Sequence, residues 1–241
     1  MGKAYFKQKC GLYAINIVAA CGVFIPEQFA GLGKAAQDCG VFRLKLTSRQ
    51  TVVAVLDEAK VSCLEQRLTE LGLAVSPYGG AVRAVKACAG NSALCPRALG
   101  DALDLGIEIQ EKFLGREVPK DVKIAVAGCP RGCTDPLCAD FGVVARGGGT
   151  FNIFLGGRSG SSKPLHGSLL AGGVHKEGVF KILEHVLKQY DELALPKERL
   201  AVTAARLGFE AFSPPPGLLG DNSPQESADQ DFLAFLNGKG K

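Results

Sequence analysis

The sequence predicts a protein of the α+β class, because strand-like and helix-like segments alternate along it and no internal repeat interrupts them. The 241 residues are 46% hydrophobic and 22% charged, which is typical of a globular protein with an ordinary core. This length suits one or two domains. The links between the segments are short, so an α/β arrangement also stays open.

The first predicted strand is the segment 12–18, which is rich in β-branched residues. It lies in an apolar run, Gly11 to Ile25, that follows three lysines and so resembles the start of a signal peptide. The run is too short to span a bilayer, and no small-residue cleavage site follows it. We therefore expect a strand here, in a cytoplasmic protein that does not enter a membrane.

Hydrophobic spacing, with the glycines and prolines that interrupt it, predicts the next elements. Pro26 opens a helix that runs to Asp38 and ends at Gly40. Pro96 opens a second helix, which places Cys95 at an N-terminus where the helix dipole favours a thiolate. The predicted ranges are strands at 41–46, 52–56 and 81–87 and helices at 63–71 and 96–114.

The continuous apolar segment 122–126 predicts a buried strand. Segments 141–145 and 151–155 predict a hairpin whose turn is the glycine run 147–149. A glycine-rich loop at 156–163 precedes predicted helices at 176–192 and 196–207. From residue 213 the composition shifts to Pro, Gly, Asp, Asn and Ser, so residues 213–241 are predicted to be a disordered tail.

The charge pattern gives no support for a nucleic acid partner. The 28 Lys and Arg residues are scattered, the net charge is only +4, and the chain has no Trp on which bases could stack. The loop at 156–163 lacks the Gly-Lys-Ser/Thr ending of a phosphate-binding loop and the glycine spacing of a dinucleotide fingerprint. Nucleotide binding therefore has little support either.

Four of the nine cysteines form two pairs: Cys88 and Cys95, with six residues between them, and Cys129 and Cys133, with three. Thiolates grouped on two short loops are typical ligands of an iron–sulfur cluster. A structural zinc site prefers closer pairs, although Cys129 and Cys133 alone would suit one. Zinc binding, simple packing and redox chemistry stay open as alternatives.

The remaining cysteines are expected to be free. Their number is odd and the chain is long enough to bury a core, so a disulfide framework is not expected. Cys10, Cys21, Cys39 and Cys63 should pack as small apolar side chains. Cys138, close to the second pair, is expected to be buried, with an additional ligand or a redox partner as alternatives.

Several segments, in the right order, resemble siroheme-dependent sulfite and nitrite reductases over about residues 12 to 212. Several motifs in this order are much more specific than any one of them alone. The segments that carry the resemblance are Leu46-Thr-Ser-Arg-Gln-Thr51, Arg83-Ala-Val-Lys-Ala-Cys88, Pro119-Lys-Asp-Val-Lys-Ile-Ala-Val-Ala-Gly-Cys129-Pro-Arg-Gly-Cys133, Ala139-Asp-Phe-Gly-Val-Val, Phe151-Asn-Ile-Phe-Leu-Gly-Gly, Glu198-Arg-Leu and Arg206-Leu-Gly-Phe-Glu.

The resemblance implies two cofactors and two units. Cys88, Cys95, Cys129 and Cys133 would bind a [4Fe-4S] cluster, and Cys133 would also be the axial ligand of the siroheme iron. The implied fold is a ferredoxin-like α/β unit, residues 1–80, followed by a siroheme- and [4Fe-4S]-binding α/β domain, residues 81–212. The first cysteine pair departs from the family, which usually has five intervening residues.

Siroheme carries eight carboxylates, so its pocket needs cations and N–H donors. Lys45 and Arg49 match family positions that hold these carboxylates. Arg131 and Arg158 are assigned to the same role from their location beside the cluster loop and the Gly156-Gly157 turn. For Arg158 and Lys163, a solvated surface charge stays open as the alternative.

The resemblance also implies an anion site of two arginines and two lysines that neutralise the substrate and relay protons. Arg83 and Lys123 match two of these positions and are the predicted catalytic residues. Val18 lies where the family has an arginine, and Asp121 where it has a lysine. Whether these two departures abolish turnover stays open.

The expected function is the six-electron reduction of sulfite to sulfide, with nitrite as the alternative substrate. A non-catalytic electron-transfer or tetrapyrrole-binding relative, and an iron–sulfur protein without haem, are further alternatives. The expected partners are the small anion and an electron-donor protein such as a ferredoxin. The family's enzymes have two similar halves and this chain resembles one, so a homodimer or a partner subunit is also expected.

Overall fold

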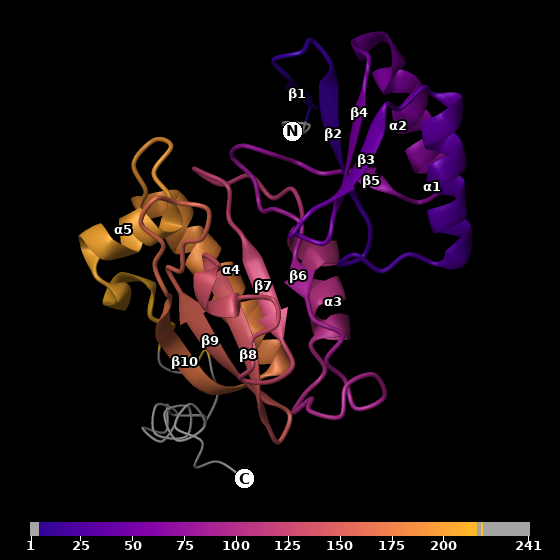
Figure 1. The fold of residues 1–241 in the computed structure, drawn as a ribbon. Coiled ribbons are helices and arrows are strands. Elements are labelled where there is room, and N and C mark those ends of the chain that lie inside the picture. The colour runs from indigo at the N-terminus through magenta and orange to yellow at the C-terminus, as the bar shows by residue number, and fades with distance from the viewer. Residues whose placement is uncertain (1–4, 216–217, 219–241) are drawn as a thin grey trace.

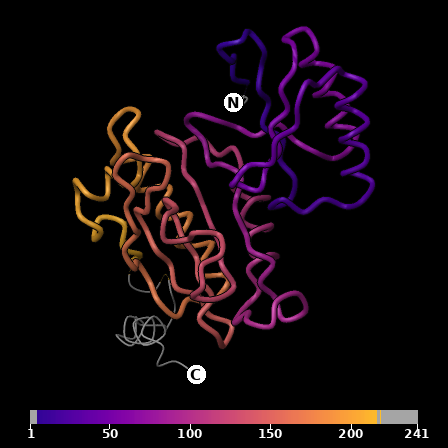
Figure 2. The backbone as a smooth tube through the Cα atoms, in the orientation of Figure 1, coloured from indigo at the N-terminus to yellow at the C-terminus, as the bar shows by residue number. Residues whose placement is uncertain are grey.

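Two five-stranded sheets carry the fold, one in each of two lobes (Figure 1). The computed structural model describes residues 5–215 and residue 218. The tube in Figure 2 shows the chain completing the first lobe before it builds the second. The predicted α+β class is therefore confirmed. The predicted disordered tail lies, apart from residues 213–215 and 218, outside the described residues.

The first lobe is an antiparallel sheet with two helices. Its strands pair in the order β1-β2-β4-β3, and β5 pairs with the other side of β2. The elements in chain order are β1 (Tyr5–Lys7), β2 (Tyr13–Val18), α1 (Pro26–Asp38), β3 (Arg43–Leu46), β4 (Val52–Leu56), α2 (Val61–Glu70) and β5 (Ala74–Val75).

Alternation along the strands separates the two faces of this sheet. Ile15, Ile17 and Leu56 are fully buried in a cluster with Leu32 of α1 and Leu64 of α2. The neighbouring residues point to the other face, where no helix of the lobe packs. Asn16, Val53 and Lys45 lie side by side there, since Asn16 and Lys45 both pair with Val53.

The second lobe is a mixed sheet in the order β10-β9-β8-β7-β6, in which β6, β7 and β8 run parallel. Its elements are β6 (Lys86–Ala87), α3 (Leu103–Phe113), β7 (Ile124–Ala127), β8 (Phe141–Gly147), β9 (Thr150–Leu155), β10 (Ser168–His175), α4 (Lys176–Leu193) and α5 (Leu200–Leu207). A short 3-10 helix, Pro136–Cys138, precedes β8.

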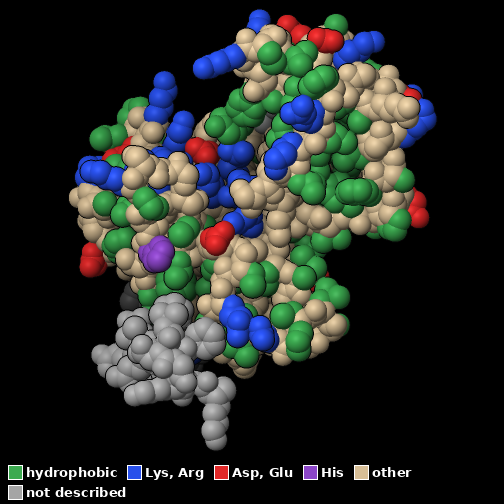
Figure 3. All heavy atoms as spheres, in the orientation of Figure 1, with side chains coloured by type: hydrophobic (Ala, Val, Ile, Leu, Met, Phe, Trp, Pro, Cys, Tyr) green, Lys and Arg blue, Asp and Glu red, His purple; other side chains and the backbone are tan. Residues whose placement is uncertain are grey.

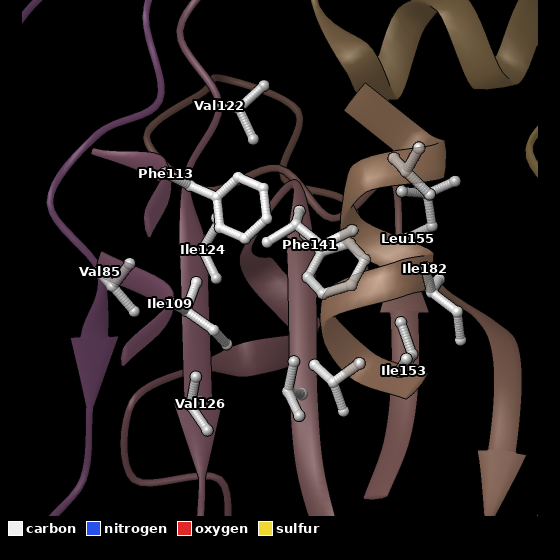
Figure 4. Close-up of a cluster of buried hydrophobic side chains, with 14 of the residues drawn as sticks. Val85, Ile109, Phe113, Val122, Ile124, Val126, Phe141, Ile153, Leu155 and Ile182 are labelled. Carbon is white, nitrogen blue, oxygen red and sulfur yellow. The ribbon is translucent and has the colours of Figure 1, made fainter. Parts of the chain in front are cut away.

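The core of the second lobe lies between this sheet and the helices α3 and α4. Phe113 of α3 stacks on Phe180 of α4 with 6.5 Å between the ring centroids. Phe141 is fully buried beneath them, which stabilises the fold by about 1.5–3 kcal/mol. Figure 4 shows this cluster, which includes Val85, Ile109, Val122, Ile124, Val126, Ile153, Leu155 and Ile182.

The turn between β3 and β4 joins the two lobes. Gln50 donates from Nε2 to the carbonyl of Ala87 (2.7 Å) and accepts the Ala87 N–H at Oε1 (2.8 Å). Arg49 donates from Nη2 to the carbonyl of Ala84. The turn itself is held by Thr47, whose Oγ1 accepts the backbone N–H groups of Arg49 and Thr51. The first lobe is thus anchored on the segment that leads into Cys88.

The predicted helix at 96–114 is wrong in its first half. The helix α3 begins only at Leu103, so Cys95 does not lie at a helix N-terminus. The segment before it is held by other parts of the chain: Leu99 N–H donates to the carbonyl of Gly128, and Ala102 N–H to that of Gly90. Asp101 Oδ1 accepts the N–H of Asp104 and so satisfies one donor of the first helical turn.

Three of the four cysteines that were expected to pack as free apolar side chains do not. Cys39, at the end of α1, and Cys63, in α2, form a disulfide bond. The two helices lie side by side on the same sheet face, which brings these two side chains together. Cys10 is exposed. Cys21 is buried as expected, and burial raises the pKa of its thiol to about 12.

The other elements differ from prediction mainly in length. The segment 81–87 forms a strand only at Lys86–Ala87, preceded by isolated bridges from Ala81 to Glu117 and from Val82 to Val122. The strands β1, β5 and β10 were not predicted; β10 is interrupted by two register shifts against β9, which obscure its pattern. None of the helices in the described part of the chain has the length and apolar character needed to cross a membrane.

Candidate functional site

The predicted thiol ligands follow the carboxyl ends of two adjacent parallel strands. Cys88 comes directly after β6, and Cys129 two residues after the end of β7. Because β6 and β7 are paired in parallel, both cysteines lie at the same end of the sheet. The loop after β6, which carries Cys95, extends from this end of the second lobe (Figure 1).

Backbone contacts join the loops that carry these thiols. Gly128 N–H donates to Cys88 Sγ at 3.1 Å, and Cys88 N–H donates to the carbonyl of Val126. Gly90 and Gly128 approach so closely that a Cβ on Gly90 would lie 2.9 Å from the Cα of Gly128. Only glycine fits at both positions, so the two loops pack backbone against backbone.

The loop that carries Cys133 folds back across the sheet. Thr134 Oγ1 donates to the carbonyl of Val126 at 2.8 Å. Asp135, whose φ of 52° is in the left-handed region, pairs with Lys86 of β6 at 3.1 Å. Cys133 is exposed on this loop, while Cys138 is half-buried. The loop therefore holds Cys133 in reach of solvent beside β6 and β7.

The Gly156-Gly157 turn packs against the same loop. A Cβ on Gly157 would lie 2.3 Å from the carbonyl oxygen of Leu137 and 2.4 Å from that of Ala139. Arg158, next in the chain, is half-buried, and its backbone forms a bridge with Leu165. Arg131 and Lys163 are exposed. Of the cations assigned by location, Arg158 is thus the one held by the fold.

A second group of predicted residues gathers at the other end of the parallel strands. Arg83 precedes β6, Lys123 precedes β7, and the turn from the first lobe adds Arg49. Two carboxylates, Asp121 and Asp140, lie among them, and a guanidinium that was not predicted, Arg199, joins the group. We call these six residues the cation cluster. Lys and Arg side chains line the hollow between the lobes in Figure 3.

Ion pairs hold the cation cluster together. Arg83 Nη1 lies 3.6 Å from Asp121 Oδ2, and both side chains are buried. Arg199 Nη2 donates to both oxygens of Asp140, at 2.9 Å and 3.2 Å. Asp140 Oδ2 also accepts the backbone N–H of Lys123 at 2.9 Å. These contacts connect all of the cluster except Arg49, whose Nη2 donates to the carbonyl of Ala84.

Burial and mutual repulsion shift the pKa values within the cluster. Burial, aided by the positive charge of Arg83, lowers the pKa of Arg49 to about 10. Burial lowers the pKa of Arg83, and burial with the nearby Arg199 lowers that of Lys123. Burial raises the pKa of Asp140 although Arg199 opposes the shift. Burial is the largest cause of each of these shifts, so they indicate a site in which several charged groups are shielded from water.

An aromatic pair covers Arg83. Its guanidinium carbon lies 4.3 Å from the centre of the Tyr78 ring, which is a cation–π contact. Phe6 of β1 packs edge-on against Tyr78, with 4.4 Å between the ring centroids. Strand β1 of the first lobe thereby supports the side chain of a predicted catalytic residue in the second.

The remaining predicted positions lie in the first lobe. Lys45 is exposed on β3 and donates from Nζ to the carbonyl of Leu46. It lies on the sheet face that the helices leave uncovered, in register with Val53 and Asn16. Val18, where the resemblance implies an arginine in the family, is buried at the end of β2 and pairs with Ala74.

The cation cluster fits an anionic ligand or cofactor. Its four cations exceed its two carboxylates. Within residues 5–215 and 218, the buried Nε atoms of Arg49, Arg83 and Arg199 have no hydrogen-bond partner. Buried donors without partners are costly, and the excess of cations over carboxylates favours a bound group rich in anionic oxygens.

The thiol loops supply the right donor atoms for an iron–sulfur cluster, on two loops that are hydrogen-bonded to each other. Within the described ranges, however, no three His, Cys, Asp or Glu side chains are arranged to hold a metal ion. The structure thus joins the loops without gathering the thiols.

Sequence reasoning missed Arg199, Asp140, Tyr78 and Gln50. Gln50, Asp140 and Arg199 lie inside segments that carry the resemblance, so those segments were the available signal. Their roles depend on contacts between residues far apart in the chain, such as the 59 positions between Arg199 and Asp140. Tyr78 lies in none of those segments.

The comparison with protein families decides the relationship. The family described as "Nitrite and sulphite reductase 4Fe-4S domain" matches residues 78–214, which is more than half of the chain. The chain belongs to this family. The family is one of oxidoreductases, and its matched domain contains both the thiol loops and all of the cation cluster except Arg49.

Some curated relatives are named sulfite reductases and others nitrite reductases. An assimilatory-type sulfite reductase of Nitratidesulfovibrio vulgaris is 28% identical over 202 residues, which cover 83% of this chain and 90% of the relative. The large subunit of the NADH nitrite reductase of Escherichia coli is 28% identical over 184 residues, 76% of this chain but only 21% of the relative. The chain thus spans about a fifth of that larger protein.

Solved structures show the same fold. Dissimilatory sulfite reductase I (DsrI) aligns over 90% of this chain and 73% of its own, with a TM-score of 0.76 and 14% identity. The NirA protein of Mycobacterium tuberculosis aligns over 87% of this chain and 41% of its own, with a TM-score of 0.69 and 20% identity.

Proposed function

We propose that the protein is a siroheme- and [4Fe-4S]-dependent reductase that takes sulfite to sulfide in a six-electron reduction, with nitrite as the second candidate. Family membership supports the reaction class. The observation that carries the proposal is the cation cluster, in which four cations lie with only two carboxylates, so that the excess positive charge favours an anion. The relative that this chain matches over 90% of its length has the name of a sulfite reductase, which favours sulfite.

The proposed cofactor ligands are the residues predicted from sequence. Cys88, Cys95, Cys129 and Cys133 would hold the cluster, with Cys133 shared with the siroheme iron. Lys45, Arg49, Arg131 and Arg158 would pair with siroheme carboxylates; of these, Arg49 has the strongest support, because it is buried with an unpaired Nε. When bound, the two cofactors would pass to the anion the electrons that an electron-donor protein such as a ferredoxin supplies.

The protein's own contribution is to bind the anion and to supply protons. Arg83 is proposed to hold the anion, because its guanidinium is rigidly placed between Tyr78 and Asp121. Lys123 is proposed to donate protons, since its lowered pKa brings it closer to neutral pH than an ordinary lysine. Arg83 is buried and Lys123 is half-buried, and this shielding from water strengthens their attraction for the anion.

The separation of thiols and cations supports a homodimer. Lys123 and Gly128 are the residues just before and just after β7, and an extended strand of this length places their Cα atoms about 16 Å apart. We propose that the thiols of one copy and the cation cluster of a second copy face the same cofactor pair. The two regions 1–80 and 81–212 are proposed to act as the two units of each copy.

The decisive experiment is anaerobic reconstitution of the purified protein with iron, sulfide and siroheme. Absorbance bands of both cofactors are expected, followed by release of sulfide from sulfite when a reduced artificial donor is added. A cluster spectrum without siroheme bands would instead indicate a plain iron–sulfur protein. Full loading without sulfide or ammonia production would indicate a non-catalytic relative and would overturn the proposed function.

A further inference from the structure

Arg199 is the cation of the cluster that no sequence motif assigned to the site. It lies immediately before α5, in extended backbone with φ of −82° and ψ of 147°. Its side chain is turned into the cluster and is only 20% exposed. The helix α5 packs on the second lobe through Leu200 and Ala204, so the position of Arg199 is fixed by the core.

Two carboxylates connect Arg199 to the two predicted catalytic residues. Asp140 receives two hydrogen bonds from Arg199 and one from the backbone of Lys123, at the start of β7. Asp121 lies between two guanidinium groups, with Oδ1 4.0 Å from Arg199 Nη1 and Oδ2 3.6 Å from Arg83 Nη1. Each carboxylate is therefore shared between Arg199 and one catalytic residue.

We propose that Arg199 is a positioning residue that keeps Asp121 from neutralising Arg83 and holds the start of β7 through Asp140. The proposal rests on the anion-binding role of Arg83 given above. Without Arg199, Asp121 keeps only the ion pair with Arg83, 3.6 Å away, and the carboxylate competes with the substrate anion for that guanidinium. With Arg199 in place, the carboxylate divides its attraction between two guanidinium groups, and Arg83 retains charge for the anion.

The chemistry of the side chain explains why an arginine is needed. A guanidinium presents several N–H donors in a planar fork and can serve two carboxylates at once, whereas a lysine ammonium is a single point of charge. If the ion pairs of Arg199 only supported the fold, breaking them would lower the stability of the protein. The effect on anion binding would then not depend specifically on Asp121.

The test is a double-mutant cycle between Arg199→Gln and Asp121→Asn in the cofactor-loaded protein. Sulfite binding is measured without reductant, from the change in the siroheme absorbance, so the readout does not depend on turnover. R199Q is expected to weaken sulfite binding about tenfold, within the range of measured couplings between contacting groups. In the D121N background the same R199Q change is expected to have a much smaller effect, which comes only from the contact between Arg199 and Asp140.

Two further variants separate positioning from stability. R206Q removes an arginine of the same helix that pairs with Glu198, outside the cluster, and should leave sulfite binding unchanged. R199Q should lower the melting temperature both with and without D121N, because Asp140 loses its partner in both. If R199Q does not fold, R199K enters the same cycle, since it keeps the charge and loses the fork.

An equal loss of sulfite binding from R199Q in both backgrounds would overturn the proposal and leave Arg199 a structural residue. Loaded protein that binds sulfite but reduces neither sulfite nor nitrite would overturn the proposed function alone, because the cycle can still be measured. Loaded protein that binds no sulfite at all would overturn both.

Discussion

The thiol loops and the cation cluster occupy opposite ends of the same parallel strands, and they are built differently. Cys88, Cys95, Cys129 and Cys133 are half-buried or exposed, on loops held by backbone hydrogen bonds. The cation cluster is held by side-chain ion pairs in the interior. A site that must admit a preformed cluster can rely on backbone scaffolding, whereas a site for a small anion needs charges fixed before the ligand arrives.

The largest expected effect tests whether the thiols and the cation cluster that form one site belong to the same copy of the chain or to two copies. Cys133→Ser should abolish the thiol site, and a chain carrying both Arg83→Gln and Lys123→Gln should lack the anion site. Neither variant should reduce sulfite alone. Coexpressed, they should regain about a quarter of the unaltered activity, because half of the dimers are mixed and each mixed dimer has one intact site.

The control for this complementation is a single chain that carries all three substitutions, coexpressed with neither partner and then with C133S. No activity is expected in either case. If the first mixture also stays inactive while both variants dimerise, thiols and cations act within one chain and the separation along β7 is bridged by the cofactor.

Removing one cation from the cluster should reduce catalysis strongly without affecting the thiol end. Arg83→Gln is expected to lower kcat/KM for sulfite by about 10²–10³-fold, by analogy with the loss of a donor to a developing negative charge. The absorbance of the iron–sulfur cluster should not change. Arg116→Gln, which removes a partly buried arginine paired with Glu184 on the surface, is the matched control and should retain activity. A similar loss in both variants would contradict the assignment.

The first lobe is the part that a disulfide stabilises. Cys39 and Cys63 are 24 positions apart, and a closed loop of this size contributes about 3 kcal/mol to the free energy of unfolding. Cys39→Ala with Cys63→Ala should therefore lower the stability measured by urea denaturation by about that amount. Sulfite reduction below the unfolding transition should persist; its loss would show that the first lobe is more tightly coupled to the site than its contacts indicate.

The smallest expected effect concerns the charge of Lys123. Burial and Arg199 lower its pKa, so the ammonium loses its proton at a lower pH than an ordinary lysine does. Nitrite binding to the loaded protein should accordingly weaken as pH rises through that lowered pKa, by about fivefold for the loss of one partly screened charge. Lys123→Arg should bind nitrite without this alkaline decline. A decline of the same size in both proteins would exclude Lys123 as its source.

Local signals predicted the helix α1 from Pro26 to Asp38, the hairpin of β8 and β9, and the strand β4. Each is determined by its own residues. The segment before α3 was predicted wrongly because its backbone donates to the carbonyls of Gly90 and Gly128. Both glycines lie outside the segment, so its own hydrophobic spacing does not indicate these contacts. The bond between Cys39 and Cys63 was missed for the same reason.

The candidate site divides in the same way. Cys88, Cys129, Arg83 and Lys123 could be named from motifs that resemble the family, and these residues lie in or shortly after the predicted strands 81–87 and 122–126. Arg199 joins the cluster only after α5 has packed on the core, and no spacing along the chain indicates that contact.

Gln50 has a consequence for any attempt to recombine such proteins. Its side-chain amide offers Ala87 one donor and one acceptor, as a residue of a neighbouring strand would. The side chain of this one residue of the first lobe therefore pairs with the strand β6 as a neighbouring strand would. A chimaera that takes its first lobe from a relative would have to include this glutamine and the turn from Thr47 to Thr51. Without them, the backbone of Ala87, directly before Cys88, would lose two hydrogen bonds.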